Sequence, residues 1–171
     1  MLSARELSAA LGLPEPTAEQ AAVIEATPEG IARVIAGAGS GKTETMALRV
    51  LWLVANEHVQ PDAVLGLTFT RKGAGELQGR IQSRLRALHE RGLAPTTDEF
   101  HSPSVSTYNS FASALYRDYA VLLGRDPDAR VLSEASAWAL ATRVVSESSL
   151  PELSEWDVTV PALVRMVRTL G

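Results

Sequence analysis

The sequence lacks cysteine, has few histidines and contains no long apolar run, and each shortage excludes a class of protein. A chain of 171 residues without cysteine forms no disulfide scaffold and no thiolate metal site, as is usual in the cytosol. Its three histidines, His58, His89 and His101, follow no metal-ligand spacing. No segment is long and apolar enough to span a bilayer, and the N-terminus shows no secretory signal pattern. We therefore expect a cytoplasmic protein with no membrane partner.

Lysine is also scarce, because Lys42 and Lys72 are the only two lysines among 16 basic residues. This bias towards arginine, with abundant alanine, is typical of a high-GC genome. Where arginine is so strongly preferred, a retained lysine indicates a position at which arginine would not serve.

The charge is unevenly distributed along the chain. The net charge is −4, yet residues 71–91 carry a local net charge of +4. The basic residues in this segment are Arg71, Lys72, Arg80, Arg84, Arg86 and Arg91. Such a segment can bind a polyanion, although on charge alone a solvated helix face explains it more simply.

The hydrophobic pattern predicts an α/β fold. Strands are expected at residues 31–35, 63–69 and 104–107. Helices are expected at residues 3–11, 17–26, 43–56, 72–89, 109–123, 133–146 and 160–170. The order strand–loop–helix–strand–helix–strand–helix predicts a parallel sheet with flanking helices. The last two helices are expected to form a separate, all-helical part. It follows a loop at residues 124–130, which is a candidate domain boundary.

A glycine-rich loop, which we call the phosphate loop, follows the first expected strand. It reads AGAGSGKT and comprises Ala36, Gly37, Ala38, Gly39, Ser40, Gly41, Lys42 and Thr43. It matches G-x-x-x-x-G-K-[ST] except that alanine stands first, where a small residue suffices. Glycines permit tight turns, so that backbone N–H groups and the following helix N-terminus converge on phosphate oxygens. The loop therefore predicts binding of a nucleoside triphosphate, whereas a plain glycine-rich turn leaves its strand–helix context unexplained.

Two residues of the phosphate loop are the expected catalytic residues. Lys42 would reach the β- and γ-phosphates of ATP, and the Thr43 hydroxyl would be a ligand of Mg²⁺. All eight loop residues are expected to bind the nucleotide.

Four segments together resemble superfamily 1A helicases of the Rep, UvrD and PcrA type. PTAEQAAVI (16–24) resembles their Q motif, and AGAGSGKT is similar to motif I. LTFTRKGAGELQGRI (67–81) is similar to motif Ia, and VSTYNSFA (105–112) to motif Ib. The resemblance implies a P-loop NTPase fold of the RecA type. Residues 1–112 would be the N-terminal part of domain 1A, and residues 113–171 would begin a helical insertion, domain 1B.

The resemblance also implies a function. The chain would bind ATP and contact single-stranded DNA as the N-terminal part of an ATP-dependent DNA helicase or translocase in DNA repair or recombination, with Mg²⁺ as cofactor. In the whole machine, ATP would close a cleft between two RecA-like domains and move the DNA, in the 3′ to 5′ direction in this family. LGLTFTRKGAGEL and VSTYNSFA most resemble helicase–nucleases of the actinobacterial AdnAB type, which suggests that the partner is a second helicase–nuclease subunit.

Gln20 matches the glutamine of the Q motif that hydrogen-bonds the adenine edge, where an amide offers a donor beside an acceptor. Gln20 also lies three residues after Thr17, in the pattern of a helix capping box. The two roles are compatible, and capping alone would account for the residue.

The resemblance assigns DNA contacts to the ends of two strands and to the helix after motif Ia. The matching residues are Thr68, Phe69, Thr70, Lys72, Arg80, Thr107, Tyr108, Asn109 and Ser110. Phe69 would stack on a base, the hydroxyls would hold phosphates, and Lys72 and Arg80 would supply positive charge. Core packing is the alternative for Phe69. Asn109 stands where the family usually has histidine, and Gly73 and Gly75 depart from its helix pattern.

ATP hydrolysis further requires an acidic pair at the end of a strand. The only adjacent Asp-Glu pair, Asp98-Glu99, has no strand before it. We therefore expect the 171-residue chain to be a fragment that binds nucleotide but neither hydrolyses ATP nor unwinds DNA alone. Two other classes remain open, namely a different phosphate-loop enzyme such as a small kinase, and a non-enzymatic DNA-binding module that uses the helix at residues 71–91.

Overall fold

The structure is a computed structural model that describes residues 1–96, 101–147 and 162. It divides the chain into two compact units, Met1–Tyr116 and Arg117–Gly171. None of the described helices is long and apolar enough to cross a membrane. The expected helix at residues 160–170 and the pair Asp98-Glu99 lie outside the described residues.

The first unit begins with two short helices, α1 (Ala4–Ala10) and α2 (Ala18–Ile24). Each starts with a capping box, in which the N-cap side chain and the third helical side chain satisfy each other's backbone N–H groups. For α2 these residues are Thr17 and Gln20, as the sequence predicts.

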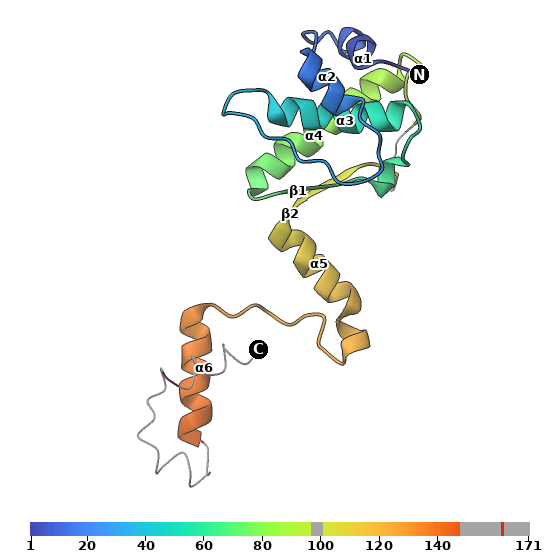
Figure 1. The fold of residues 1–171 in the computed structure, drawn as a ribbon. Helices are drawn as coiled ribbons and strands as arrows, with labels where there is room; N and C mark the ends of the chain where they lie inside the picture. Colours follow the sequence, from blue (N-terminus) through green and yellow to red (C-terminus); the bar gives the residue numbers. More distant parts are fainter. Residues whose placement is uncertain (97–100, 148–161, 163–171) are drawn as a thin grey trace. The chain divides into compact units, whose positions relative to one another are not determined.

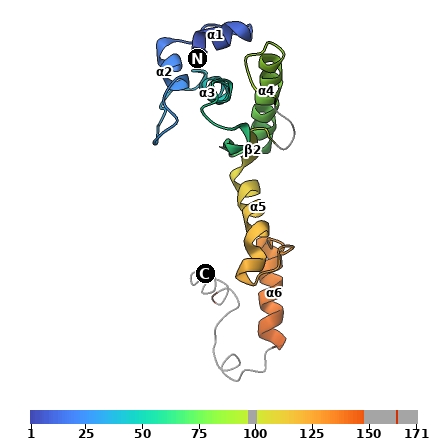
Figure 2. The ribbon, with the colours of Figure 1, turned by 90° about the vertical axis from the view of Figure 1, so that its right-hand side faces the viewer.

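Two longer helices form the centre of this unit, α3 (Lys42–Ala55) and α4 (Arg71–His89). Helix α3 lies between α2 and α4 (Figures 1 and 2). Buried side chains from all four helices make one core, with the following members: Ala4, Leu7, Ile24, Ala47, Leu48, Leu51, Trp52, Val54, Ile81, Leu85 and Leu88. Helix α4 forms despite three interior glycines because its apolar face is buried in this core.

The sheet has two strands among the described residues, β1 (Leu65–Thr68) and β2 (Ser104–Thr107). They pair in parallel, with Leu65 opposite Ser104 and Thr68 opposite Thr107. Helix α4 connects them and packs against both. This β–α–β arrangement confirms the predicted α/β fold with a parallel sheet.

The expected strand at residues 31–35 is wrong for this structure. The segment forms neither strand nor helix, and the side chains of Ile31 and Ile35 are 104% and 79% exposed. A short apolar run shows only that its side chains favour burial, and a strand also needs a neighbour to pair with. Among the described residues, β1 and β2 pair only with each other, so this segment has no partner strand.

The remaining described elements are α5 (Tyr108–Ala120), a 3₁₀ turn η2 (Val121–Leu123) and α6 (Glu134–Glu147). A 3₁₀ turn η1 (Pro61–Ala63) precedes β1. Helix α6 lies within the second unit. Apart from the segment 31–35, each predicted helix or strand in the described part lies within about two residues of its observed bounds, if η2 is taken as the last turn of α5.

Candidate functional site

The phosphate loop makes its turns at glycines. Gly39 and Gly41 have φ angles of +75° and +80°, a region that favours glycine. A Cβ atom at Gly37 or Gly39 would meet no atom within 4 Å, so the space beside these two glycines is open. Gly41 is the N-cap of α3 and no side chain caps this helix. Its first N–H groups are therefore presented to the loop, as a bound anion requires.

The side chain of Lys42 folds back over the loop that precedes it. Its Nζ atom donates hydrogen bonds to the carbonyl oxygens of Ala36 and Gly37, the first at 2.8 Å. The Ser40 hydroxyl donates to the same Gly37 carbonyl at 2.9 Å. The ammonium group thus lies at the mouth of the loop, where phosphate oxygens are alternative acceptors.

Two threonines lie in the first turn of α3 and have different surroundings, Thr43 at the end of the phosphate loop and Thr45 just after it. Thr45 is buried, and its hydroxyl donates to the Gly41 carbonyl at 3.1 Å, which fixes the end of the loop. Thr43 is exposed and lines the same cavity as Lys42. A hydroxyl oxygen beside bound phosphates is a suitable ligand for Mg²⁺, so Thr43 fits the ion expected there. Among the described residues, no three His, Asp or Glu side chains gather as a separate metal site.

Gln20 completes the capping box of α2 and also contacts the phosphate loop. Its Oε1 atom accepts from the Thr17 N–H at 3.0 Å, which completes the capping box. Its Nε2 atom donates to the Ser40 carbonyl at 3.2 Å, so the same amide also contacts the phosphate loop. Each amide atom retains capacity for one more hydrogen bond, as recognition of a nucleobase edge needs.

A cavity of about 500 Å³ lies beside this amide. Its lining includes Gln20, Ala36, Ser40 and Lys42, together with Val23, Val34 and Ile35. Polar groups of the loop and apolar side chains next to it thus line one cavity, which suits a ligand with an aromatic base and charged phosphates.

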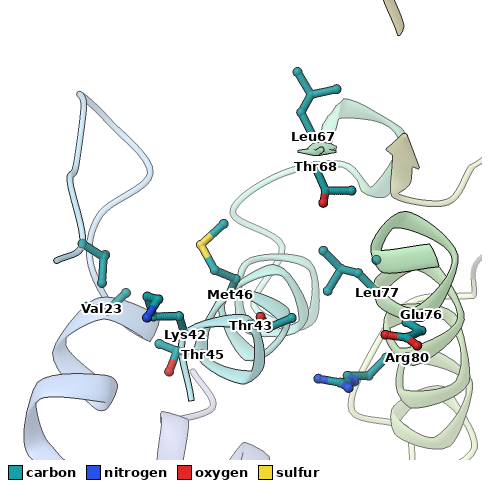
Figure 3. A pocket seen from close by; sticks show the side chains of 12 residues that line it. Val23, Lys42, Thr43, Thr45, Met46, Leu67, Thr68, Glu76, Leu77 and Arg80 are labelled. Carbon is teal, nitrogen blue, oxygen red and sulfur yellow. The ribbon is translucent and has the colours of Figure 1, made fainter. Parts of the chain in front are cut away.

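A second cavity, of about 390 Å³, lies between α3, α4 and the end of β1 (Figure 3). Lys42, Thr43 and Met46 line it from α3, and Thr68 from β1. From α4 the lining side chains include Glu76, Leu77 and Arg80. Lys42 therefore borders both cavities.

The predicted DNA-contacting residues at the ends of the two strands come together at one edge of the sheet. Thr68 and Thr107 are the last residues of β1 and β2 and face each other in register. Phe69 and Tyr108 follow them, and their ring centroids are 5.1 Å apart. Phe69 is 89% exposed and Tyr108 is 49% exposed, so the core-packing alternative for Phe69 is wrong.

Hydroxyl groups at this edge cap the helices that leave it. The Thr70 hydroxyl accepts from the Gly73 N–H at 3.0 Å, and the Thr107 hydroxyl accepts from the Ser110 N–H at 3.1 Å. A Cβ atom at Gly73 would lie 2.9 Å from the Thr70 hydroxyl oxygen, so glycine accommodates this cap. Asn109 is exposed and follows Tyr108 in the first turn of α5.

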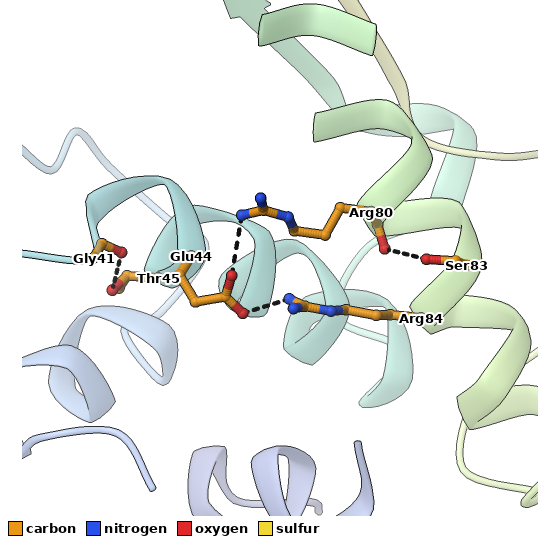
Figure 4. A network of polar contacts seen from close by, with 6 residues as sticks. All are labelled: Gly41, Glu44, Thr45, Arg80, Ser83 and Arg84. Carbon is orange, nitrogen blue, oxygen red and sulfur yellow. Dashed lines mark hydrogen bonds and ion pairs between the residues drawn. The ribbon is translucent and has the colours of Figure 1, made fainter. Parts of the chain in front are cut away.

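The two basic residues predicted for DNA lie in different surroundings on α4. Lys72 is exposed, with its Nζ atom 3.8 Å from a Glu76 carboxylate oxygen. Arg80 is half-buried and donates to Glu44 at 3.0 Å. Arg84 donates to the other oxygen of Glu44, so both guanidinium groups hold one carboxylate (Figure 4).

Sequence reasoning missed Glu44, which follows Thr43 in the first turn of α3. Its partners Arg80 and Arg84 lie on α4, 36 and 40 residues further along the chain. No local pattern could reveal this contact, because it depends on how the two helices pack.

Sequence reasoning also missed Arg49, which lies in the middle of α3. Its guanidinium donates to the carbonyl oxygens of Val23, Ala26 and Thr27, and so ties the end of α2 to α3. An arginine within the apolar stretch MALRVLWLVA was the available signal, but the sequence alone does not identify acceptors more than 20 residues away.

Comparison with known families assigns most of the chain. The family model described as the UvrD/REP helicase N-terminal domain matches residues 16–159. This range contains the phosphate loop, Gln20 and both strand ends described above.

Individual relatives agree with that assignment. The chain is 32% identical to DNA helicase II of Haemophilus influenzae over 127 residues, which cover 74% of this chain and 16% of the relative. It is 36% identical to an ATP-dependent helicase/nuclease subunit of Desulforamulus reducens over 162 residues, 91% of this chain and 13% of the relative. It is also 30% identical to the ATP-dependent DNA helicase PcrA of Bacillus subtilis over 124 residues, 72% of this chain and 15% of the relative. The chain thus spans only 13–16% of the length of these relatives.

Proposed function

We infer, since the chain belongs to the UvrD/REP helicase N-terminal domain family, that it is the nucleotide-binding and DNA-contacting part of an ATP-dependent DNA helicase. The observation that carries this proposal is that two packed helices join the phosphate loop to the exposed edge of the sheet. The phosphate loop opens into α3, and α4 packs against α3 and begins at the exposed edge with Phe69 and Tyr108.

We place the fold in the P-loop NTPase class on the geometry of the loop. A triphosphate needs a set of hydrogen-bond donors. Here these are the backbone N–H groups at the positive-φ glycines and at the uncapped start of α3, together with the Lys42 ammonium. A bound triphosphate with Mg²⁺ supplies the free energy of hydrolysis. For this chain we propose that Lys42 holds the terminal phosphates, Thr43 holds the ion, and Gln20 reads the base.

The edge with Phe69 and Tyr108 is proposed to bind single-stranded DNA. Exposed aromatic rings stack on bases of any sequence, and the hydroxyls of Thr70 and Ser110 and the side-chain amide of Asn109 suit phosphate oxygens. Lys72 adds an exposed positive charge at the first turn of α4. Such contacts hold a strand without reading its sequence, as a translocating enzyme requires.

We assign hydrolysis and unwinding to the whole protein that contains this domain. In the part of the chain that the structure describes, neither strand ends in an acidic pair beside the phosphate loop. The proposal includes action on DNA in repair or recombination, in the cytoplasm. It also includes a second helicase–nuclease subunit, because the name of one relative describes a subunit of a helicase/nuclease.

The test is a pair of titrations on the purified chain. Calorimetry with ATP and Mg²⁺ measures nucleotide binding, and fluorescence anisotropy with a labelled single-stranded oligonucleotide measures DNA binding. We expect both ligands to bind, and ATP turnover to be absent. Nucleotide binding without DNA binding would favour a different phosphate-loop enzyme such as a kinase. Salt-dependent DNA binding without nucleotide binding would favour a DNA-binding module.

A further inference from the structure

The first turn of α3 carries a negative charge where the proposed nucleotide would bring several more. Glu44 directly follows Thr43 and lies in that turn. A carboxylate there stabilises the helix itself, because the N-terminal end of a helix is electropositive. The same carboxylate repels a phosphate group that binds at the same helix end. The site therefore needs something that neutralises Glu44.

Two arginines of α4 supply that neutralisation. Arg80 lies 3.0 Å from one carboxylate oxygen of Glu44, and Arg84 contacts the other (Figure 4). The two arginines are four residues apart, so they project from the same face of α4. The Arg84 side chain is only 17% exposed, and those of Glu44 and Arg80 are 37% and 36% exposed. Both carboxylate oxygens are engaged, and the three side chains together carry a net positive charge.

One member of this group, Arg80, reaches the cavity beside the proposed phosphate site. Arg80 lines the cavity of about 390 Å³ that Lys42 and Thr43 also line (Figure 3). Glu76 borders the same cavity, and its partner is Lys72 at 3.8 Å. The arrangement argues against Arg80 as a contact to the DNA backbone, because its guanidinium is directed to α3.

We propose that Arg80 and Arg84 are positioning residues of the nucleotide site, which neutralise Glu44 and so allow the start of α3 to accept phosphate. The inference rests on the proposed nucleotide binding. It assigns Arg80 to the nucleotide and leaves Lys72 as the cation of α4 for DNA. Loss of either arginine then weakens nucleotide binding through Glu44, and removal of the Glu44 charge repairs the loss.

The experiment measures the dissociation constant of ATP with Mg²⁺ by calorimetry for the chain and its variants. Arg84→Gln should weaken binding about fivefold, because the group of three side chains loses one positive charge and no longer outweighs the charge of Glu44. Glu44→Gln combined with Arg84→Gln should restore affinity to about that of the unsubstituted chain. Arg84→Lys, which keeps the charge, should bind nearly normally. Arg86→Gln is the matched control, since Arg86 is exposed on the same helix.

Thermal unfolding of each variant shows whether it is folded at the titration temperature. A double variant that binds no better than Arg84→Gln overturns the inference, because it means that the arginine acts on its own or only supports the fold. If the unsubstituted chain binds no ATP, the proposed function fails, and the inference with it. If the chain binds ATP and all variants bind equally, only the inference fails.

Discussion

The ring of Phe69 lies against the ring of Tyr108, with centroids 5.1 Å apart and planes tilted by 35°. The two residues are far apart in sequence, but each directly follows a strand, and the strands pair in parallel with Thr68 opposite Thr107. The pairing register therefore brings the rings together at one edge of the sheet. Because Phe69 is 89% exposed, its face is available to a nucleobase.

Phe69→Ala should weaken binding of a single-stranded oligonucleotide about tenfold, the typical contribution of one stacked base. Phe69→Tyr keeps a ring at the same position and should bind nearly as well as the unsubstituted chain. Fluorescence anisotropy at fixed salt measures both. Equal affinity of Phe69→Ala and the unsubstituted chain would remove this edge from the DNA site.

Gln20→Glu should separate base recognition from helix capping. A glutamate keeps the acceptor for the Thr17 N–H but loses the donor that reaches the Ser40 carbonyl. We expect the preference for ATP over GTP to fall about tenfold, the effect of one or two hydrogen bonds, while the capping box is kept. Competition titrations with the two nucleotides measure the preference.

Gln20→Ala removes both roles and should also lower the free energy of unfolding by about 1 kcal/mol through loss of the capping box. If Gln20→Glu leaves the preference for ATP intact, capping is the only role of this residue.

Arg49→Met should destabilise the first unit. The variant keeps the apolar stem but removes the guanidinium that holds the Val23, Ala26 and Thr27 carbonyl oxygens. Hydrogen bonds to a charged donor typically contribute about 1.5–3 kcal/mol, so we expect a loss of about 2 kcal/mol in urea unfolding followed by tryptophan fluorescence. Arg86→Met, at an exposed position of α4, should change the stability by less than about 0.5 kcal/mol. Equal stability of the two variants would contradict the account of Arg49.

Stability at acid pH should depend on Glu6. The Ser3 backbone N–H donates to its carboxylate at 2.8 Å and the Ser3 hydroxyl at 2.7 Å, and these bonds lower the pKa of Glu6 below its usual value. A carboxyl group whose pKa is lower in the folded state stabilises the fold above its unfolded pKa, and this contribution is lost as the pH falls through the folded pKa.

In Glu6→Gln the side chain is uncharged at every pH and does not titrate. Its melting temperature should therefore fall less between about pH 6 and pH 3 than that of the unsubstituted chain. Thermal unfolding across this range measures the difference. Parallel curves for the two proteins would show that the capping box of α1 does not contribute to the acid response.

Local sequence patterns predicted what local interactions determine. The capping box of Thr17 and Gln20 marks the start of α2, and the helix expected from Thr43 after the phosphate loop begins one residue earlier, at Lys42. The strand at residues 104–107 was predicted with its observed bounds, and it forms because β1 provides a partner for it.

Non-local interactions were outside the reach of these patterns. The segment at residues 31–35 has the composition of a buried strand, but its state depends on a neighbouring strand rather than on its own residues. Glu44 and Arg80 are 36 residues apart in sequence, and only the packing of α3 against α4 brings them together. The basic character of residues 71–91 was visible, but not which of its cations face α3.

The measurement that tests the central proposal most directly uses the two lysines of the chain. Calorimetric titration with ATP and Mg²⁺ compares the unsubstituted chain with Lys42→Ala and Lys72→Ala. We predict one binding site in the unsubstituted chain and in Lys72→Ala, and affinity at least about thirtyfold weaker in Lys42→Ala, the expected loss of charge-assisted hydrogen bonds to phosphate. Binding that is equally strong in Lys42→Ala, or absent from the unsubstituted chain, would contradict a nucleotide site at the phosphate loop.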